Sequence, residues 1–116
     1  MSSPLLDKSL DFATEIVLFY EAYSKTRKDT TIVKQLLRSA TSIGANINEA
    51  IYRNSKADFI AKLHISLKEA GESIYWLTLL KRTKLVDYDF DHLILLAEEI
   101  KRMLISSLNT AKGNKK

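Results

Sequence analysis

Apolar residues recur at alternating steps of three and four through most of the 116-residue chain. That spacing places them on one side of an α-helix, whereas a half-buried strand would need a step of two. Polar stretches and charged runs divide the pattern into four segments, at about residues 4–25, 30–53, 56–83 and 88–110. The connections are only a few residues long, which makes consecutive helices antiparallel neighbours. The sequence therefore predicts an all-α fold, an antiparallel up-down-up-down four-helix bundle in one domain over residues 1–116.

The apolar rows of these segments define the expected core. In the second and third segments the row keeps its alternation throughout, as in a coiled-coil seam. The second row consists of Val33, Leu36, Ala40, Ile43, Ile47 and Ala50. The third consists of Ile60, Leu63, Leu67, Ala70, Ile74 and Leu77, and the fourth of Leu93, Ala97, Ile100 and Leu104. The first segment carries two adjacent rows, one with Leu6, Leu10, Ala13, Val17 and Tyr20 and one with Phe12, Ile16, Phe19 and Tyr23.

Capping residues stand at the expected helix starts. Ser3 precedes Pro4, and proline is well tolerated at the first helical position. Asp29 or Thr30 is expected to cap the second helix, and Ser55 the third, because their side-chain oxygens accept hydrogen bonds from unpaired backbone amides. These residues support the segment boundaries.

Composition excludes several classes of protein. A hydrophobic fraction of 46% is too high for a disordered chain. No run approaches the roughly 18 apolar residues that span a membrane, and the start of the chain, with Asp7, lacks the order of a signal peptide. The absence of cysteine excludes disulfides and thiolate metal sites. We therefore expect a cytoplasmic protein with no membrane association.

The second helix has little charge on the side that should face water. Residues 39–46 carry no charged side chain, and small residues permit another backbone to come close. Gly44 lowers helix stability by about 1 kcal/mol relative to alanine, which close contact would offset; alternatively, Gly44 marks a bend in an exposed helix. Together with the two apolar rows of the first helix, this predicts self-association into a homo-oligomer.

Three stretches carry a family resemblance: residues 38–50 (RSATSIGANINEA), 55–63 (SKADFIAKL) and 68–77 (KEAGESIYWL). They resemble the four-helix-bundle proteins encoded in intervening sequences of bacterial 23S rRNA genes, a family also labelled S23 ribosomal protein. The resemblance covers about 40 residues of the second and third helices. The polar positions of the family motif correspond to Arg38, Ser42, Asn46, Glu49 and Glu72. The chain departs from the family pattern where Gly44 replaces a frequent proline, where Ala50 replaces a glycine and where Lys68-Glu69 replaces a Gly-Ser pair.

The resemblance implies a ring-like homopentamer and no settled biochemical activity. A related branch, the accessory variability protein of diversity-generating retroelements, is a basic pentameric barrel that works with a reverse transcriptase and nucleic acid. By analogy, a nucleic acid or a nucleic-acid-processing protein is a candidate partner here.

The five polar motif residues, Arg38, Ser42, Asn46, Glu49 and Glu72, have two interpretations. They either line a ligand pocket or form hydrogen-bonded contacts between helices or subunits, where buried charge has to be paired. No nucleophile and base stand together, which favours the structural interpretation. Pairing of Arg38 with Glu49 or Glu72 is a hypothesis that needs another helix or chain.

Other chemistry-bearing residues are better explained structurally. His64 and His92 lie on different helices without the spacing of a zinc site. Asp87, Asp89 and Asp91 lack the glycine and closing glutamate of a calcium loop, so we interpret them as helix-capping acids. Tyr75-Trp76 could stack on nucleic-acid bases, but core or interface packing fits better. The sequence predicts no catalytic residue, metal or cofactor.

The basic residues give the strongest indication of function. The formal net charge is +4, so a pentamer would carry about +20, which attracts polyanions. The predicted topology gathers one cluster, the upper rim, at one end: Lys25, Arg27, Lys28, Lys81, Arg82 and Lys84. It gathers the lower rim at the other end: Arg53, Lys56 and Lys112, with Lys115 and Lys116.

The sequence therefore predicts a non-catalytic homo-oligomer that binds RNA, DNA or a nucleic-acid-processing partner through these rims. Two alternatives stay open. In one, the protein is a protein-binding scaffold with no nucleic-acid role. In the other, the lysines only complement helix C-termini and keep the surface soluble.

Overall fold

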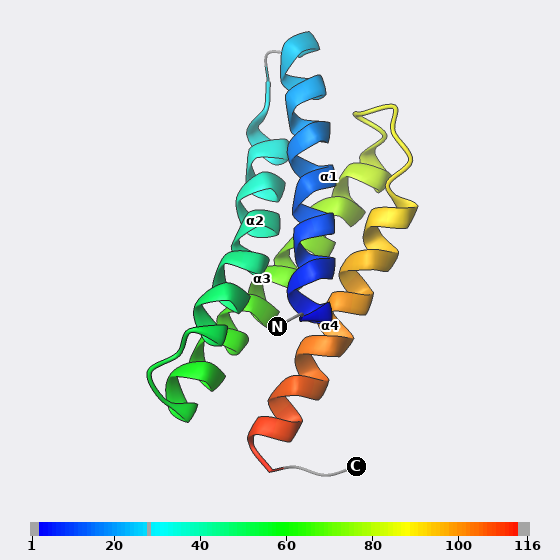
Figure 1. The fold of residues 1–116 in the computed structure, drawn as a ribbon. Coiled ribbons are helices and arrows are strands. Elements are labelled where there is room, and N and C mark those ends of the chain that lie inside the picture. Colours follow the sequence, from blue (N-terminus) through cyan, green and yellow to red (C-terminus); the bar gives the residue numbers. More distant parts are fainter. Residues whose placement is uncertain (1–2, 28, 114–116) are drawn as a thin grey trace.

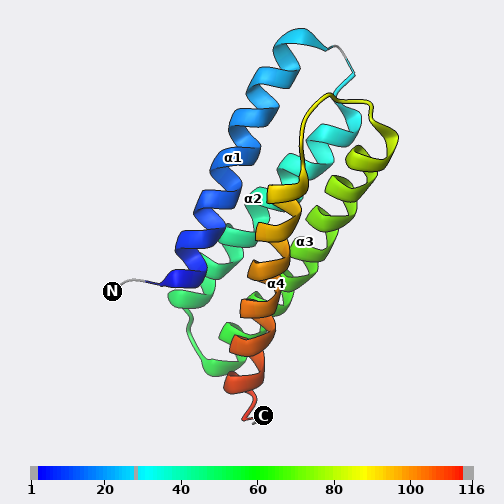
Figure 2. The ribbon, with the colours of Figure 1, turned by 90° about the vertical axis from the view of Figure 1, so that its right-hand side faces the viewer.

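The computed structural model describes residues 3–27 and 29–113, and these residues form four helices and no strand. The helices are α1 (Pro4–Thr26), α2 (Thr31–Ile51), α3 (Lys56–Thr83) and α4 (Asp91–Ala111). They run up, down, up and down along the long axis of a body measuring 46 × 26 × 22 Å (Figures 1 and 2). The predicted all-α, antiparallel four-helix bundle is the fold of the chain.

The four helix–helix contacts differ in extent. The α2–α3 contact is the largest and the α1–α4 contact the smallest. The α1–α4 contact includes an ion pair near the surface, Lys8 Nζ–Glu99 Oε2 at 3.2 Å, and a hydrogen bond between His92 Nε2 and Glu15 Oε1 at 2.9 Å. The bundle therefore has one tightly packed side and one side closed partly by polar side chains.

The predicted apolar rows of α2 and α4 form the core without exception. All members of both rows are buried, and Leu108 extends the α4 row by one further turn. The regular alternation of these rows keeps a single face of each helix turned inward. The heptad pattern therefore predicted these two faces correctly.

Only the more aromatic row of α1 is buried. Phe12 and Ile16 are fully buried and Phe19 is 7% exposed, whereas Leu10 and Val17 of the other row are 54% and 45% exposed. An aromatic side chain removes more apolar area from water than Leu or Val. The larger side chains therefore occupy the core. In the other row, Leu6 and Tyr20 pack partly against the core, whereas Leu10 and Val17 lie at the surface.

Buried serines allow α2 and α3 to pack closely. The hydroxyl groups of Ser39 and Ser73 lie 2.9 Å apart, and Ser66 Oγ donates to the backbone oxygen of Ile43 at 2.8 Å. All three serines are buried. In α3, Ser66 and Ser73 take inward positions, while Ile60, Leu67 and Ile74 of the predicted row are only partly buried.

Gly44 supports a close approach within the chain. It is buried, and a Cβ atom at this position would lie 3.5 Å from Cβ of Ser9 on α1. The expected close contact with another backbone is therefore present, although its partner is α1 of the same chain and not another copy. The alternative explanation, a bend in an exposed helix, does not fit a buried residue. Gly44 is a contact point between α1 and α2.

The helix ends follow the capping residues closely. Ser3 Oγ accepts from the amide of Leu6 at 3.2 Å, and Ser55 Oγ accepts from the amide of Asp58 at 3.0 Å. At α2, the carboxylate of Asp29 accepts from the amide of Thr31 at 3.1 Å, although Thr30 is the capping position. This hydrogen bond is the main reason that the pKa of Asp29 is lowered.

The connection between α3 and α4 is longer than the sequence suggests. Lys84 ends α3 in the left-handed conformation, with φ of 56°, and α4 begins at Asp91 instead of near residue 88. Asp89 holds this start, because its carboxylate accepts from the amide of Asp91 at 3.0 Å. At the opposite end, α2 stops at Ile51, two residues before the expected boundary at 53. Within residues 3–27 and 29–113, no helix has the length and hydropathy needed to cross a bilayer.

Candidate functional site

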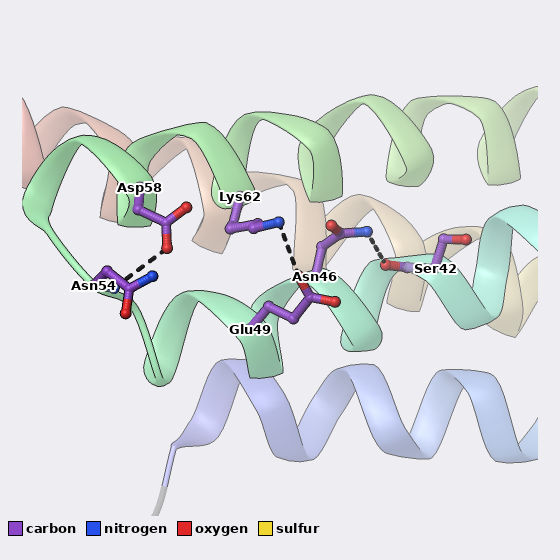
Figure 3. A network of polar contacts seen from close by, with 6 residues as sticks. All are labelled: Ser42, Asn46, Glu49, Asn54, Asp58 and Lys62. Atoms are coloured by element: carbon purple, nitrogen blue, oxygen red, sulfur yellow. Dashed lines mark hydrogen bonds and ion pairs between the residues drawn. The ribbon is translucent and has the colours of Figure 1, made fainter.

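Two members of the polar motif, Ser42 and Asn46, lie half-buried on α2 beside α3 (Figure 3). Both side chains bond to the backbone of their own helix. Ser42 Oγ donates to the oxygen of Arg38 at 2.8 Å, and Asn46 Nδ2 donates to the oxygen of Ser42 at 2.8 Å. These bonds occupy one polar atom of each side chain and leave the Asn46 carbonyl oxygen as an acceptor.

Glu49 pairs with a residue that the sequence analysis did not single out. Its carboxylate lies 2.8 Å from Nζ of Lys62 on α3 (Figure 3). The hydrogen bond to Glu49, followed by the charge of Glu49, raises the pKa of Lys62. Glu49 and Lys62 are nearly the same number of residues from Ser55 in the turn, so an antiparallel hairpin of α2 and α3 brings them together. This equal spacing could have predicted the pair from the sequence. Asn48, Tyr52, Asn54 and Asp58 line a polar pocket beside this pair.

Arg38 and Glu72 are both exposed, and neither forms an ion pair among the described residues. They influence a third residue, Glu69 on α3, which is half-buried. Burial is the main cause that raises the pKa of Glu69, and the charge of Glu72 raises it further. The positive charges of Lys68 and Arg38 oppose this shift.

We expect Glu69→Gln to raise the melting temperature at about pH 7. The raised pKa means that the folded protein disfavours the Glu69 carboxylate relative to the unfolded chain. That penalty is present above the unfolded-state pKa and disappears as pH falls and the folded protein binds the proton. The gain should therefore shrink in thermal melts recorded at decreasing pH, down to about pH 4.

Glu72→Gln is the matched control for this prediction. It removes only the repulsion that Glu72 exerts on Glu69, so its gain in melting temperature should be smaller. A lower melting temperature for Glu69→Gln at about pH 7 would show that the Glu69 carboxylate makes a stabilising contact.

The upper rim lies at the end of the bundle where the α1–α2 and α3–α4 connections meet (Figure 1). Carboxylates partly neutralise it: Lys25 pairs with Glu21 at 3.5 Å and Lys81 with Asp91 at 2.8 Å. Arg27 donates to the backbone oxygen of Leu85. Arg82 and Lys84 are exposed, and Lys28 lies outside the described residues.

The lower rim lies at the opposite end, at the α2–α3 connection and the end of α4 (Figure 2). Arg53, Lys56 and Lys112 are all exposed there. The guanidinium of Arg53 lies 4.9 Å from the ring centre of Phe59. None of these three cations forms an ion pair within the described part of the chain. Lys115 and Lys116 lie outside that part.

The remaining candidates differ in their burial and contacts. His64 is exposed, and His92 pairs with Glu15. No group of three potential metal-ligating side chains occurs in the described ranges. Trp76 packs partly against the core, and its buried Nε1 has no hydrogen-bond partner among the described residues. The neighbouring Tyr75, whose ring contacts that of Trp76, is 61% exposed.

Comparison with known families extends the resemblance beyond α2 and α3. The profile of the 23S rRNA-intervening sequence protein family matches residues 3–106, which include α1, α2, α3 and most of α4. The chain belongs to this family. All five motif residues and the whole upper rim fall within the matched range. Of the lower rim, Arg53 and Lys56 fall within it, whereas Lys112, Lys115 and Lys116 lie beyond it.

A solved structure supports the assignment to the 23S rRNA-intervening sequence protein family. The chain is 47% identical to a protein of unknown function from the S23 ribosomal protein family of Bacteroides thetaiotaomicron VPI-5482, with a TM-score of 0.84. The match covers 90% of this chain and 97% of the other. No curated protein matches the chain. The two comparisons agree on the family and on the fold of the chain. The Bacteroides protein is itself of unknown function, so the match suggests no activity.

Proposed function

We propose that the chain forms a non-catalytic cytoplasmic homo-oligomer that binds nucleic acid, or a partner that processes it, through its basic rims. Five copies is the number that the family resemblance implies. The lower rim contributes most of the affinity and the upper rim less. Lysine and arginine contacts to phosphate give affinity that depends on salt and little on sequence.

The observation that carries this proposal is the difference between the two rims. At the upper rim, the carboxylates of Glu21 and Asp91 compete with phosphate for Lys25 and Lys81, so that Arg82 and Lys84 are the exposed cations there without an ion pair among the described residues and without a hydrogen bond to the backbone of another segment. At the lower rim, Arg53, Lys56 and Lys112 are exposed cations with no ion pair among the described residues. A symmetric assembly would repeat this lower cluster once for each copy and so raise the local positive potential.

Self-association is supported by two apolar side chains that α1 leaves at the surface. Leu10 and Val17 are 54% and 45% exposed, and nearby α2 exposes the neutral side chains of Thr41 and Ala45. Burying this surface against another copy would remove apolar area from water, at about 25 cal/mol per Å². A neutral surface also avoids the desolvation of charged groups on contact.

Anisotropy titration of labelled single-stranded RNA and double-stranded DNA tests the nucleic-acid role. We expect binding at about 50 mM salt that weakens strongly by about 200 mM. The double variant Arg53→Glu/Lys56→Glu should bind at least about tenfold more weakly, because phosphate contacts are lost and negative charge replaces them.

Lys68→Glu/Arg102→Glu is the matched control, since it makes the same charge change at exposed positions within α3 and α4. Equal losses in the two double variants would mean that net charge, and not the lower rim, governs binding. Absence of binding at low salt would contradict the nucleic-acid role.

Light scattering coupled to size-exclusion chromatography tests the assembly. Leu10→Glu/Val17→Glu should yield a monomer of unchanged helicity, because charge at the buried contact has to be desolvated. Leu95→Glu/Ile105→Glu, which places the same two charges on 69% and 40% exposed positions of α4, should remain assembled. A monomeric wild-type mass at micromolar concentration would contradict self-association.

A protein-binding scaffold with no nucleic-acid role is the second candidate function. It is favoured by large apolar side chains exposed away from the α1 row, including Tyr52 at 78% and Leu95 at 69%. An assembled wild type that binds neither RNA nor DNA at low salt would favour this alternative.

A further inference from the structure

A pocket of about 570 Å³ lies between the second half of α1 and the segment that joins α3 to α4. Its aliphatic lining comes from Leu18, Ala22 and Val86. Pockets of this size hold small organic ligands. Neither the polar motif nor the lower rim contributes a residue to it.

Aromatic side chains form one wall of the pocket. Phe19, Tyr23 and Tyr88 all line it, and Phe19 contacts both tyrosines. The ring centres of Phe19 and Tyr23 are 5.9 Å apart with an interplanar angle of 27°, and those of Phe19 and Tyr88 are 4.7 Å apart at 53°. The faces of such rings carry partial negative charge and attract cations.

Carboxylates outnumber cations in the lining of the pocket. Glu15, whose Oε1 also contacts His92 Nε2 at 2.9 Å, and Asp87 line it, and Asp89 follows Tyr88 directly. Burial, followed by the charges of Glu15 and Asp89, raises the pKa of Tyr88, as expected when the surroundings disfavour a further anion. One cation, Arg27, stands against these carboxylates in the lining.

Arg27 shows that the pocket accommodates a guanidinium group. The Cζ atom of Arg27 lies 5.6 Å from the ring centre of Tyr23, within the range of a cation–π interaction. Its Nη1 donates to the backbone oxygen of Leu85 at 3.2 Å. The chain itself therefore occupies one aromatic face with a cation and leaves the rest of the cavity open.

We propose that this pocket binds a small organic cation, an alkylammonium or guanidinium compound, with its charge over the Tyr88 side of the aromatic wall and near the carboxylates. The carboxylates would repel a phosphate. The aliphatic lining suits an ion with an apolar body better than a bare metal ion. The site is independent of nucleic-acid binding at the lower rim.

Titrations followed by backbone amide NMR shifts of Ala22, Asp87 and Tyr88 test the proposal. The probes are tetramethylammonium, ethylguanidinium, the neutral isostere neopentyl alcohol and adenosine monophosphate. We expect both cations to give saturable shifts at these amides, and the alcohol to bind at least about tenfold more weakly. Equal binding of the alcohol would overturn the proposal in favour of a simple apolar pocket.

Two variants with opposite expected effects make the test specific. Asp87→Asn should weaken cation binding about threefold, because one negative charge is lost at short range. Arg27→Ala should strengthen it by a similar factor, since a competing positive charge leaves an aromatic face. Arg102→Ala, which removes a distant exposed charge on α4, should leave cation affinity unchanged.

The remaining outcomes overturn the proposal. Saturable binding of adenosine monophosphate that weakens in Arg27→Ala would identify a nucleotide site instead. Shifts that fail to saturate with either cation up to about 50 mM would show that no such site exists, because a dissociation constant above that concentration corresponds to a binding free energy weaker than about 2 kcal/mol. The nucleic-acid titrations of the lower-rim variants are read separately, so failure of one proposal does not imply failure of the other.

Discussion

Phe12→Ala is expected to lower the free energy of unfolding by about 3–5 kcal/mol. Phe12 is fully buried in the aromatic row of α1, where its ring belongs to the central apolar cluster. Its truncation removes the transfer energy of the ring and leaves a cavity that the surrounding helices fill only in part. Since domains of this size are stable by only about 5–15 kcal/mol, the variant should lose a large fraction of its stability.

Urea denaturation followed by circular dichroism measures this loss. All samples should share one protein concentration, because self-association would make the apparent stability depend on it. Leu18→Ala on the same helix is the control: Leu18 is 63% exposed, so its truncation should change stability by no more than about 0.5 kcal/mol. Similar losses in both variants would mean that α1 is held mainly by its outer surface.

Ser66→Leu is expected to lower the free energy of unfolding by about 2–4 kcal/mol, the sum of overpacking and one lost hydrogen bond. Ser66 is fully buried where α3 meets α2, and its hydroxyl donates to the backbone oxygen of Ile43 at 2.8 Å. A leucine side chain at this contact forces the two helices apart. The displacement also disturbs the neighbouring Ser39–Ser73 contact.

Two further serine variants separate the causes of this loss. Ser66→Ala keeps the close approach and removes only the hydroxyl, so it should cost about 1 kcal/mol. Ser106→Leu makes the same change as Ser66→Leu at an exposed position of α4 and should be nearly neutral. A Ser66→Leu protein as stable as wild type in the same urea series would show that the α2–α3 contact has unfilled space.

The fold was predictable where hydrophobic periodicity is unambiguous. In α2 and α4, a single row of apolar residues keeps the alternation of three and four steps, so only one orientation buries the whole row. In α1, both rows are apolar, and periodicity alone cannot rank them. The burial of Phe12 and exposure of Val17 depend on how much area each row removes from water against its neighbours.

The serines of α3 were not predictable from a pattern of polar and apolar residues. Ser66 and Ser73 look like surface residues in the sequence, but a serine hydroxyl can bond to a helix backbone oxygen and so be buried without losing its partner. Ser73 does so with the oxygen of Glu69 at 2.9 Å. Their small size then permits the close α2–α3 approach.

The candidate sites were predictable in outline only. Topology alone places the basic residues at the two ends. The neutralisation of Lys81 by Asp91 and the pairing of Glu49 with Lys62 depend on side-chain conformations that sequence spacing does not specify. The cation pocket depends on the path of residues 84–90, where no periodic pattern guides a prediction.

The uneven contacts between the helices have a consequence for local unfolding. Regions with few buried contacts open with less free energy than the whole molecule, and ion pairs near the surface weaken as salt screens them. The α1–α4 contact combines both properties. We therefore expect transient openings to begin by separating α1 from α4, while the hairpin of α2 and α3 keeps its amide protons longest against exchange with solvent.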